Sequence, residues 1–312
     1  MNVEALLDPE IREFLKTMPM MGPVVLEKLP ALRAARLAAA PAPTLSDAVE
    51  RRDYVIPGRD GAPEVKLRVH RPKGATGALP CIYWMHGGGY VMGTYEMEDL
   101  RFDKWCTALN CVGVAVEYRL APETPYPGPL EDCYAGLAWV HARAAELGVD
   151  LNRLGIGGAS AGGGLAAGLA LLARDRGEIS LAFQLLIYPM IDDQRTTVSS
   201  QWEVPIWPPV SNERGWAAYL GDLSGGDVPS YAAAARATDL GGLPPALICV
   251  GTLDGFLDED IGYAQRLNHA GVPTELHVYP GGPHGFDAIM PGTALARRAR
   301  REMDEWLARV LR

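Results

Sequence analysis

The feature that most restricts the fold of this chain is residues 154–173, LGIGGASAGGGLAAGLALLA. These twenty residues carry no charge, and seven of them are glycine. The only serine in the run is Ser160. Such a run fits three structures that exclude one another: a membrane-spanning helix, a dinucleotide-binding turn, and a strand–turn–helix elbow that presents a nucleophile. The rest of the chain has to decide among them.

A membrane helix is the least favoured of the three structures. Six of the seven glycines lie between positions 155 and 164, and each disfavours a helix interior by about 1 kcal/mol relative to alanine. The sequence GLAAG at 164–168 resembles a membrane helix-packing motif, but it occurs once. We therefore expect no membrane helix here.

A dinucleotide-binding turn fits the run better. Gly155, Gly157 and a small residue at 160 reproduce G-x-G-x-x-G/A between an expected strand and an expected helix, and Asp192 follows the next strand. However, this alternative explains neither a second glycine cluster upstream nor a histidine-containing loop near the C-terminus. It stays open as the second choice.

The nucleophile elbow explains all three clusters. GASAG at 158–162 matches G-x-S-x-G, where Gly158 and Gly162 leave room for the neighbouring strand and helix backbones around Ser160. The sequence YWMHGGGYVMG (83–93) follows an apolar strand, and its His86 lies 74 residues before Ser160. Three successive glycines let backbone N–H groups turn toward a common point, which is what stabilising a tetrahedral oxyanion requires.

A serine hydroxyl becomes nucleophilic only when a histidine, itself oriented by a carboxylate, accepts its proton. In the elbow fold the chain order is serine, acid, histidine. Three histidines follow Ser160: His269 near a helix end, His277 inside a strand, and His284 in the loop GGPHGF. We expect His284 to be the base, since it lies in the loop after the last strand.

The acid is predicted to be Asp254, the first carboxylate after an apolar strand and 30 residues before His284. Asp258 is the alternative. Asp258, Glu259 and Asp260 are better explained as the start of a helix, where negative charge suits the helix dipole.

Strand and helix patterns alternate along most of the chain. Residues 48–71 predict a β-hairpin with an Asp-Gly turn. Further strands are predicted at 79–85, 111–118, 153–158, 181–189, 245–251 and 273–280, and helices at 129–148, 257–271 and 295–312. We therefore expect an α/β fold with a mostly parallel, twisted sheet covered by helices on both faces.

Two segments do not fit this alternation. Residues 1–45 are helical, and residues 193–235 contain Trp202, Trp207 and Trp216. Insertions of this length are usually lids or binding loops. We expect these two segments to form a helical cap on a core made of residues 46–192 and 236–312.

The ordered motifs HGGG (86–89), GASAGG (158–163), DGFLD (254–258) and HGF (284–286) resemble those of the hormone-sensitive lipase-like, or family IV, esterases of the α/β-hydrolase superfamily. EYRLAPETPYP (117–127) and YPMIDD (188–193) extend the resemblance, which covers about residues 80–290. It implies the α/β-hydrolase fold and cofactor-free hydrolysis of carboxylic esters with short to medium acyl chains. It also implies oxyanion donors in the N–H groups of Gly88, Gly89 and Ala161, with His86 and the Tyr118–Glu123 stretch as scaffolding.

The chain departs from the family pattern at two places. Ala159 stands where the family commonly has aspartate, so a side-chain hydrogen bond from that position is absent. The acid motif reads Asp254-Gly255-Phe256 where the family more often has D-P-L. Neither departure removes a predicted catalytic group.

The predicted mechanism is attack of Ser160 on an ester carbonyl, with His284 accepting the proton and Asp254 holding the imidazole. Trp202, Trp207 and Met20 are predicted to shape an apolar acyl pocket. Two alternatives remain: acyl transfer to another acceptor through the same acyl-enzyme, and a non-catalytic ligand-binding receptor built on this scaffold.

Composition restricts the partners. The net charge of −9 and pI near 5.2 disfavour nucleic acid and strongly anionic substrates. Five cysteines without a C-x-x-C pair indicate neither a zinc site nor a disulfide framework, and we expect no metal and no cofactor. The acidic N-terminus lacks signal-peptide character, so a cytoplasmic enzyme is expected. The expected partner is a small-molecule ester, without a membrane, and a homodimer is left open.

Overall fold

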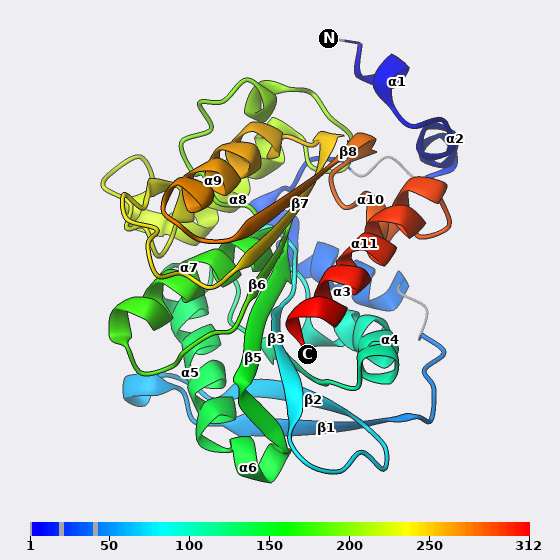
Figure 1. Cartoon of the computed structure of the whole chain (residues 1–312). Helices are drawn as coiled ribbons and strands as arrows, with labels where there is room; N and C mark the ends of the chain where they lie inside the picture. Colours follow the sequence, from blue (N-terminus) through cyan, green and yellow to red (C-terminus); the bar gives the residue numbers. More distant parts are fainter. Residues whose placement is uncertain (1, 19–21, 40–42) are drawn as a thin grey trace.

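The computed structural model describes residues 2–18, 22–39 and 43–312. One eight-stranded sheet runs through the molecule in the order β1-β2-β4-β3-β5-β6-β7-β8 (Figure 1). β1 pairs antiparallel with β2 and β2 with β4, and every other pairing is parallel. The strands are β1 (Val49–Ile56), β2 (Val65–Pro72), β3 (Leu79–Met85), β4 (Val112–Glu117), β5 (Val149–Ala159), β6 (Gln184–Ile187), β7 (Ala246–Leu253) and β8 (Thr274–Pro283).

The first two strands form the predicted hairpin. A short turn, η2 (Arg59–Gly61), joins them, with Asp60 at φ 51° and Gly61 at φ 80°. Asp and Gly are among the residues that accept a positive φ most readily, which explains why this pair marks the turn.

The parallel strands are buried on both faces. Every residue of β3, LPCIYWM, is buried, which explains its unbroken apolar sequence. Successive side chains alternate between two hydrophobic clusters: Tyr83 and Met85 belong to one, Ile82 and Trp84 to the other. The two clusters occupy opposite faces of the sheet.

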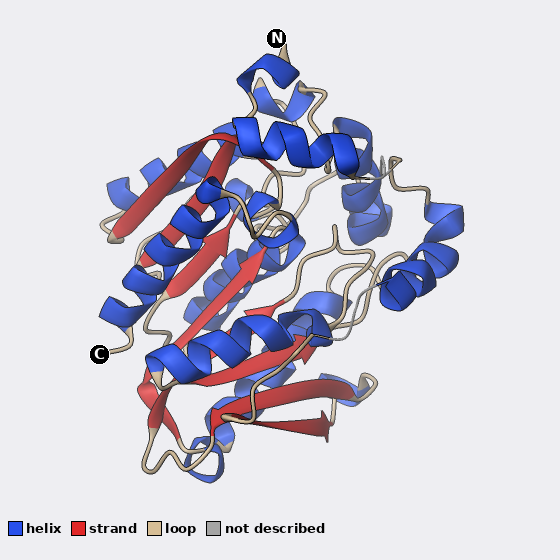
Figure 2. Ribbon diagram, turned by 90° about the vertical axis from the view of Figure 1, so that its right-hand side faces the viewer, coloured by secondary structure: helices blue, strands red, loops and turns tan. Residues whose placement is uncertain are grey.

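Helices cover both faces, and this confirms the predicted α/β class (Figure 2). One face carries α5 (Gly128–Ala142), α6 (Ala144–Leu147), α7 (Ala161–Arg176) and α9 (Leu257–His269), and the other carries α4 (Asp99–Leu109) and α11 (Ala294–Val310). The single helix predicted over 129–148 is wrong in one respect. Arg143 leaves helical geometry at φ −108° and ψ 18°, so the segment forms two helices, and Gly148 ends the second in the left-handed region.

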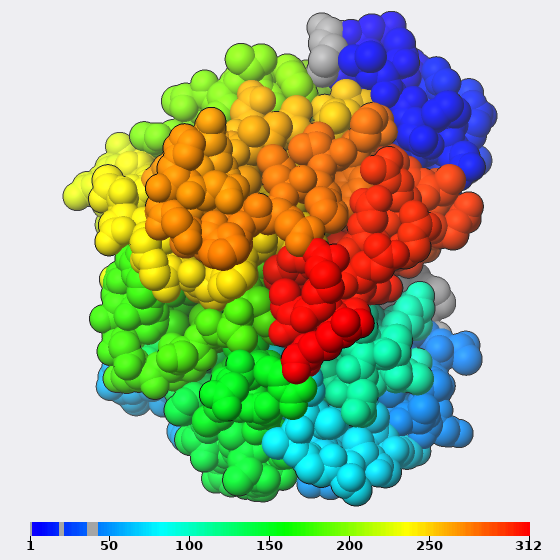
Figure 3. All heavy atoms as spheres, in the orientation of Figure 1, coloured from blue at the N-terminus to red at the C-terminus, as the bar shows by residue number. Residues whose placement is uncertain are grey.

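The N-terminal segment contains α1 (Val3–Leu6), α2 (Pro9–Thr17), η1 (Leu26–Lys28) and α3 (Leu29–Ala39). Asp8 N donates to Gly281 O (3.1 Å), and Ala294 N donates to a Glu10 carboxylate oxygen (2.6 Å). Figure 3 shows the first helices, in blue, packed beside the C-terminal segment in orange and red. The N-terminal segment therefore lies against β8, the edge strand that ends just before His284.

The segment between β6 and β7 contains η4 (Ser199–Gln201), α8 (Pro209–Leu220), η5 (Gly221–Leu223) and η6 (Ala234–Arg236). It contacts the N-terminal segment, because Val24 N donates to Ser211 Oγ at 3.1 Å. The two segments that interrupt the strand–helix alternation are thus directly joined.

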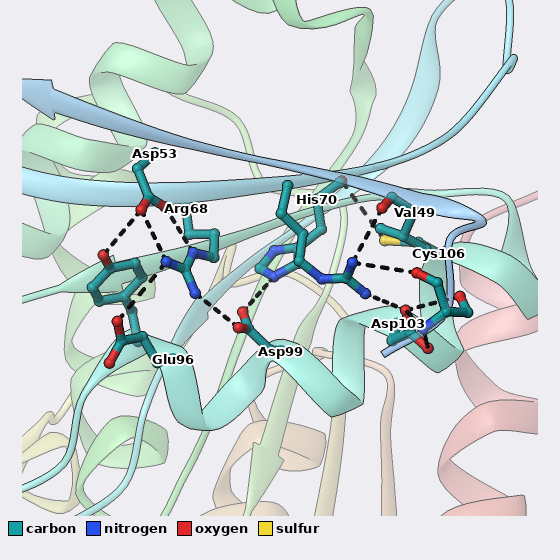
Figure 4. Close-up of polar contacts among 11 residues, drawn as sticks. Val49, Asp53, Arg68, His70, Glu96, Asp99, Asp103 and Cys106 are labelled. Atoms are coloured by element: carbon teal, nitrogen blue, oxygen red, sulfur yellow. Dashed lines mark hydrogen bonds and ion pairs between the residues drawn. The ribbon is translucent and has the colours of Figure 1, made fainter. Parts of the chain in front are cut away.

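A polar network links the hairpin to α4 (Figure 4). The Arg68 guanidinium lies 2.7 Å from carboxylate oxygens of both Asp53 and Asp99, and His70 Nε2 lies 2.9 Å from the other Asp99 oxygen. These contacts cross from β1 and β2 to the first turn of α4. In the residues that the structure describes, no helix is long and apolar enough to cross a membrane.

Candidate active site

Ser160 occupies the sharp turn between β5 and α7. Its backbone has φ 58° and ψ −123°, a conformation that non-glycine residues rarely adopt. Hydrogen bonds hold it on both sides: Ser160 N donates to Ile187 O (2.9 Å), and Ser160 O accepts from Gly164 N (3.0 Å) and Met190 N (2.9 Å). The strained turn is thus fixed by β6 and the loop that follows it.

Two of the glycines around Ser160 are required for steric reasons. A Cβ on Gly158 would lie 2.2 Å from Gly162 O, and a Cβ on Gly162 would lie 2.1 Å from Met85 O. Both distances are far below van der Waals contact, and the obstructing atoms are backbone. No side chain fits at either position, as the elbow motif predicts.

His284 joins the two other predicted residues. Its Nε2 lies 2.9 Å from Ser160 Oγ and its Nδ1 lies 2.8 Å from Asp254 Oδ2. Ser160, His284 and Asp254 are 7%, 6% and 1% exposed. The second Asp254 oxygen accepts from Phe256 N (3.0 Å), so the carboxylate is held on both oxygens. The structure therefore brings together three residues that are distant in sequence.

The alternatives lie elsewhere. Asp258 Oδ2 accepts from Ser199 N (2.8 Å), which ties α9 to η4 and leaves Asp258 away from the imidazole. His269 ends α9. His277 lies in β8 between Glu275 and Glu302, at 3.5 and 3.7 Å. Neither histidine is placed beside Ser160.

The glycine loop after β3 lies against the elbow. Gly88 and Gly89 have φ 133° and 60°, and a Cβ on Gly87 would lie 2.9 Å from Ala159 O. Within the part of the chain that the structure describes, the N–H groups of Gly88, Gly89 and Ala161 donate to no other atom. These donors are free to bind an oxygen placed next to Ser160.

His86 supports this loop as a neutral side chain. Its ring stacks on Tyr118 (4.2 Å between centroids, 13° between planes), and Tyr118 OH donates to His86 O (2.7 Å). Burial lowers the pKa of His86 to about 4, although a backbone hydrogen bond with Gly87 opposes the shift. A neutral imidazole can donate its Nδ1 hydrogen to Gly87 O, 2.9 Å away.

The structure treats the three predicted pocket residues differently. Trp207 lies over the glycine loop: a Cβ on Gly89 would be 2.1 Å from its indole ring, and the ring centre is 6.4 Å from that of His284. Trp202 is half-buried beside η4, and in the described residues it has no aromatic contact with His284. Met20 lies outside the described residues.

Two acids behind the site differ from the sequence interpretation. Glu259 and Asp260 do lie in the first turn of α9, but they face inward. Glu259 accepts from Ile191 N and Asp192 N at 3.1 and 3.2 Å, and the Asp260 oxygens have no partner among the described residues. Burial raises the pKa of both carboxyls well above the ordinary range, and this favours their neutral forms over the charged forms that the helix dipole would attract.

Sequence reasoning also missed Tyr188 and Asp287. Tyr188 packs edge-on against the His284 ring at 4.8 Å, and its hydroxyl donates to Asp287 Oδ1 at 2.7 Å. Both side chains are buried. Their only sequence signal is their position: Tyr188 is the first residue of YPMIDD, and Asp287 directly follows HGF.

The described part of the chain contains neither a metal-binding cluster nor an exposed thiol. No group of three or more His, Cys, Asp or Glu side chains there is placed to hold a metal ion. The five cysteines are buried free thiols.

A buried Ser–His–Asp arrangement, with its serine at a strand–helix elbow of a parallel sheet and beside a glycine loop, defines a serine hydrolase of the α/β-hydrolase class. A family model described as "alpha/beta hydrolase fold" matches residues 82–288. The chain belongs to this family, as a hormone-sensitive lipase-like (family IV) esterase.

Individual relatives of the chain are also named as esterases. The chain is 37% identical over 247 residues to carboxylesterase NlhH of Mycobacterium tuberculosis, covering 77% of each chain. It is 31% identical over 243 residues to an arylesterase of Saccharolobus solfataricus, covering 76% of this chain and 77% of the relative. The solved structure titled "Bacterial Heroin Esterase" is 42% identical and covers 100% of both chains with a TM-score of 0.92. The predicted carboxylesterase activity on small-molecule esters is confirmed at this level, and acyl transfer is not favoured.

Proposed function

We propose that this carboxylesterase uses Ser160 as the nucleophile, His284 as the general base and Asp254 as the residue that orients the imidazole. The observation that carries the proposal is the pair of contacts at His284, 2.9 Å to Ser160 Oγ and 2.8 Å to Asp254 Oδ2. Both lie within hydrogen-bond reach for proton transfer.

The steps follow from this geometry. Ser160 Oγ attacks the ester carbonyl carbon while its proton passes to His284 Nε2. The tetrahedral intermediate collapses, and His284 returns the proton to the leaving alkoxide, which departs as the alcohol. A water molecule then gives a proton to His284 and attacks the acyl-enzyme, and breakdown of the second intermediate releases the carboxylic acid and restores the Ser160 hydroxyl.

We assign the oxyanion hole to the N–H groups of Gly88, Gly89 and Ala161. The assignment is supported by their lack of other acceptors in the described residues and by the positive φ values of the two glycines. Donors fixed before the reaction stabilise the charge that develops on the carbonyl oxygen without further reorganisation.

The proposed substrates are neutral esters with short to medium acyl chains. Ser160 and His284 are almost fully enclosed, and the Trp207 ring restricts the space over the glycine loop. The net charge of −9 disfavours anionic esters. We further propose that residues 1–45 and 193–235 act as a cap, supported by the contact between Val24 and Ser211. The cytoplasmic location stays a prediction from the acidic N-terminus, and the absence of nucleic-acid and membrane partners stays a prediction from the net charge and the sequence pattern.

The test replaces Ser160 with alanine. Turnover of p-nitrophenyl esters should fall by roughly 10⁶-fold, because the reaction loses its nucleophile. The melting temperature should not fall, since the strained backbone at φ 58° carries a side chain of nearly the same size. If Ser160→Ala retained more than a small fraction of wild-type turnover, the assignment would be wrong.

A series of p-nitrophenyl esters of increasing acyl length tests the substrate class with the wild-type enzyme. We expect the highest kcat/KM at short chains. A maximum at long chains would contradict the proposed range while leaving the catalytic residues in place. Competition between water and an added alcohol, read by product analysis, measures how much acyl transfer accompanies hydrolysis.

A further inference from the structure

Arg33, on α3, connects the N-terminal segment to residues 91, 121 and 123 through its guanidinium. Its Nε donates to Val91 O and its Nη2 to Ala121 O, both at 2.8 Å. The same guanidinium forms a two-point pair with the Glu123 carboxylate, at 2.7 and 2.9 Å. Arginine is the side chain suited to this task, because its planar group presents several donors in a rigid arrangement.

The two carbonyls that Arg33 binds lie in or beside the glycine loop. Gly88 O accepts from Val91 N and Met92 N, both at 3.1 Å, so residues 88–92 form a tight turn. Tyr90 O accepts from Ala121 N at 3.0 Å. Arg33 therefore closes a ring of hydrogen bonds that runs through the turn, across to residue 121 and back to the guanidinium.

The opposite side of the turn is held by packing. A Cβ on Gly215 of α8 would lie 3.0 Å from Gly89 O, and the Trp207 ring lies over Gly89. Such contacts limit how far the turn can move toward α8, but they do not orient its peptide planes. The donors that orient the carbonyls at residues 91 and 121 come from Arg33.

We infer that Arg33 is a positioning residue for ester hydrolysis: it fixes the 88–92 turn so that the N–H groups of Gly88 and Gly89 stay directed at the oxygen on which charge develops. This inference rests on the proposed oxyanion hole. It also makes the seating of the N-terminal segment a condition for full catalytic rate, because the guanidinium reaches the loop only when α3 is docked. Arg33 contacts neither Ser160 nor His284 and takes no part in proton transfer.

The experiment compares Arg33→Met, Arg33→Lys and a control, Arg214→Met. Like Arg33, Arg214 forms a hydrogen bond from its guanidinium to a backbone carbonyl and connects the N-terminal segment to the rest of the chain, because it donates to Val24 O. Unlike Arg33, it does not contact the 88–92 turn. Kinetics use p-nitrophenyl acetate. A trifluoromethyl ketone, which forms a tetrahedral adduct with an active-site serine, serves as the probe of the oxyanion site.

For Arg33→Met we expect kcat to fall about 10- to 100-fold with KM within about twofold, less than the loss on deleting an oxyanion donor outright. The affinity for the trifluoromethyl ketone should fall in parallel. Arg33→Lys should not restore kcat, because a single ammonium cannot serve two carbonyls and a carboxylate. Arg214→Met should keep wild-type kcat and inhibitor affinity, even if its melting temperature drops.

Wild-type kcat and inhibitor affinity in Arg33→Met would overturn the inference, as would full recovery in Arg33→Lys or an equal loss in Arg214→Met. Labelling of Ser160 by diethyl p-nitrophenyl phosphate separates this result from the proposed function. If the wild-type enzyme is not labelled at Ser160, the proposed function fails, and the inference with it. If it is labelled at one equivalent and Arg33→Met is kinetically unchanged, only the role of Arg33 is wrong.

Discussion

At the scale of single residues, the site depends on side chains held in backbone conformations that cost energy. Ser160 has φ 58°. Ile206 has φ 76° and is the central residue of a γ-turn, which the hydrogen bond from Trp207 N to Pro205 O (3.0 Å) closes. A positive φ is rare for a β-branched residue and persists only where its surroundings impose it. Ser160 Oγ lies 2.9 Å from His284 Nε2, and Trp207, which follows Ile206, has its ring centre 6.4 Å from that of His284.

Asp254→Asn and Asp258→Asn should behave differently. Asp254→Asn removes the carboxylate that holds the His284 tautomer, so kcat should fall by about 10⁴-fold. Asp258→Asn changes a hydrogen bond to Ser199 N, so it should cost about 1 kcal/mol of stability and little activity. Steady-state kinetics and thermal melts on both variants decide. Loss of activity in Asp258→Asn alone would mean that the two acids are exchanged.

Trp207→Ala should shift the preferred acyl length upward, because removing the indole enlarges the space over Gly89. Turnover of the shortest esters should change little. The measurement is kcat/KM across the p-nitrophenyl series, with Trp202→Ala alongside, for which we expect a smaller shift. A uniform fall across all chain lengths, together with a lower melting temperature, would assign Trp207 to packing.

At the scale of elements, the first turn of α9 joins a catalytic loop to buried acids. Asp254 precedes the helix, while Glu259 and Asp260 enter the core from it. Their inward orientation follows from the helix period: positions 259, 260, 263, 264 and 267 form the buried face of α9. Two buried carboxyls thus take places where apolar residues would normally pack.

Asp260→Asn should stabilise the protein at pH 8 and change little at pH 4. Burial raises the pKa of Asp260 in the folded state, and the neighbouring Glu259 and Asp254 raise it further. The unfolded chain ionises this carboxyl above about pH 4 while the folded chain keeps it protonated, so stability falls as the pH rises toward the folded pKa. Asparagine has no proton to lose. Thermal melts at the two pH values test this, at about 2–4 °C for each kcal/mol recovered, and a lower melting temperature for Asp260→Asn at pH 8 would contradict it.

At the scale of the whole molecule, contacts between distant segments hold the sheet and the site together. The N-terminal segment forms hydrogen bonds with three parts of the molecule: with the end of β8 through Asp8, with α8 through Val24, and with the 88–92 turn through Arg33. At the other end of the sheet, Arg68 and Asp99 fasten the antiparallel hairpin to α4. These connections are polar and specific, whereas the two hydrophobic clusters on the sheet faces contain the buried apolar side chains of the core.

Arg68→Met should lower the free energy of unfolding by about 1–3 kcal/mol, because it leaves two carboxylates, one of them buried, without their shared cation. The control is Arg52→Met, whose ion pair with Glu50 is exposed and should matter by less than about 0.5 kcal/mol. Chemical denaturation measures both. Because the network is remote from Ser160, kcat/KM should remain at the wild-type value in either variant. An equal effect of the two substitutions on stability would contradict a special role for Arg68.

Much of the candidate site could be predicted because its demands are local. The elbow needs Gly158 and Gly162 within two residues of Ser160, and the glycine loop is one contiguous tetrapeptide, so steric and hydrogen-bond requirements appear directly as sequence motifs. Asp254 and His284 could be selected because each follows a strand, and the carboxyl ends of parallel strands meet at one edge of a sheet. The α/β class followed from unbroken apolar strands alternating with helices.

The remaining features were decided by tertiary structure. Arg33 meets Val91 across 58 positions and Tyr188 meets Asp287 across 99, and no local pattern marks either pair. Glu259 and Asp260 looked like helix-opening acids because the first turn of a helix favours negative charge, but the orientation of α9 on the sheet turns them inward. The sequence by itself determined which residues can do the chemistry, since that depends on side-chain type and near neighbours. Only the folded chain decided which groups hold those residues in place and which carboxyls have a raised pKa, because burial and long-range contacts exist only after the elements have packed.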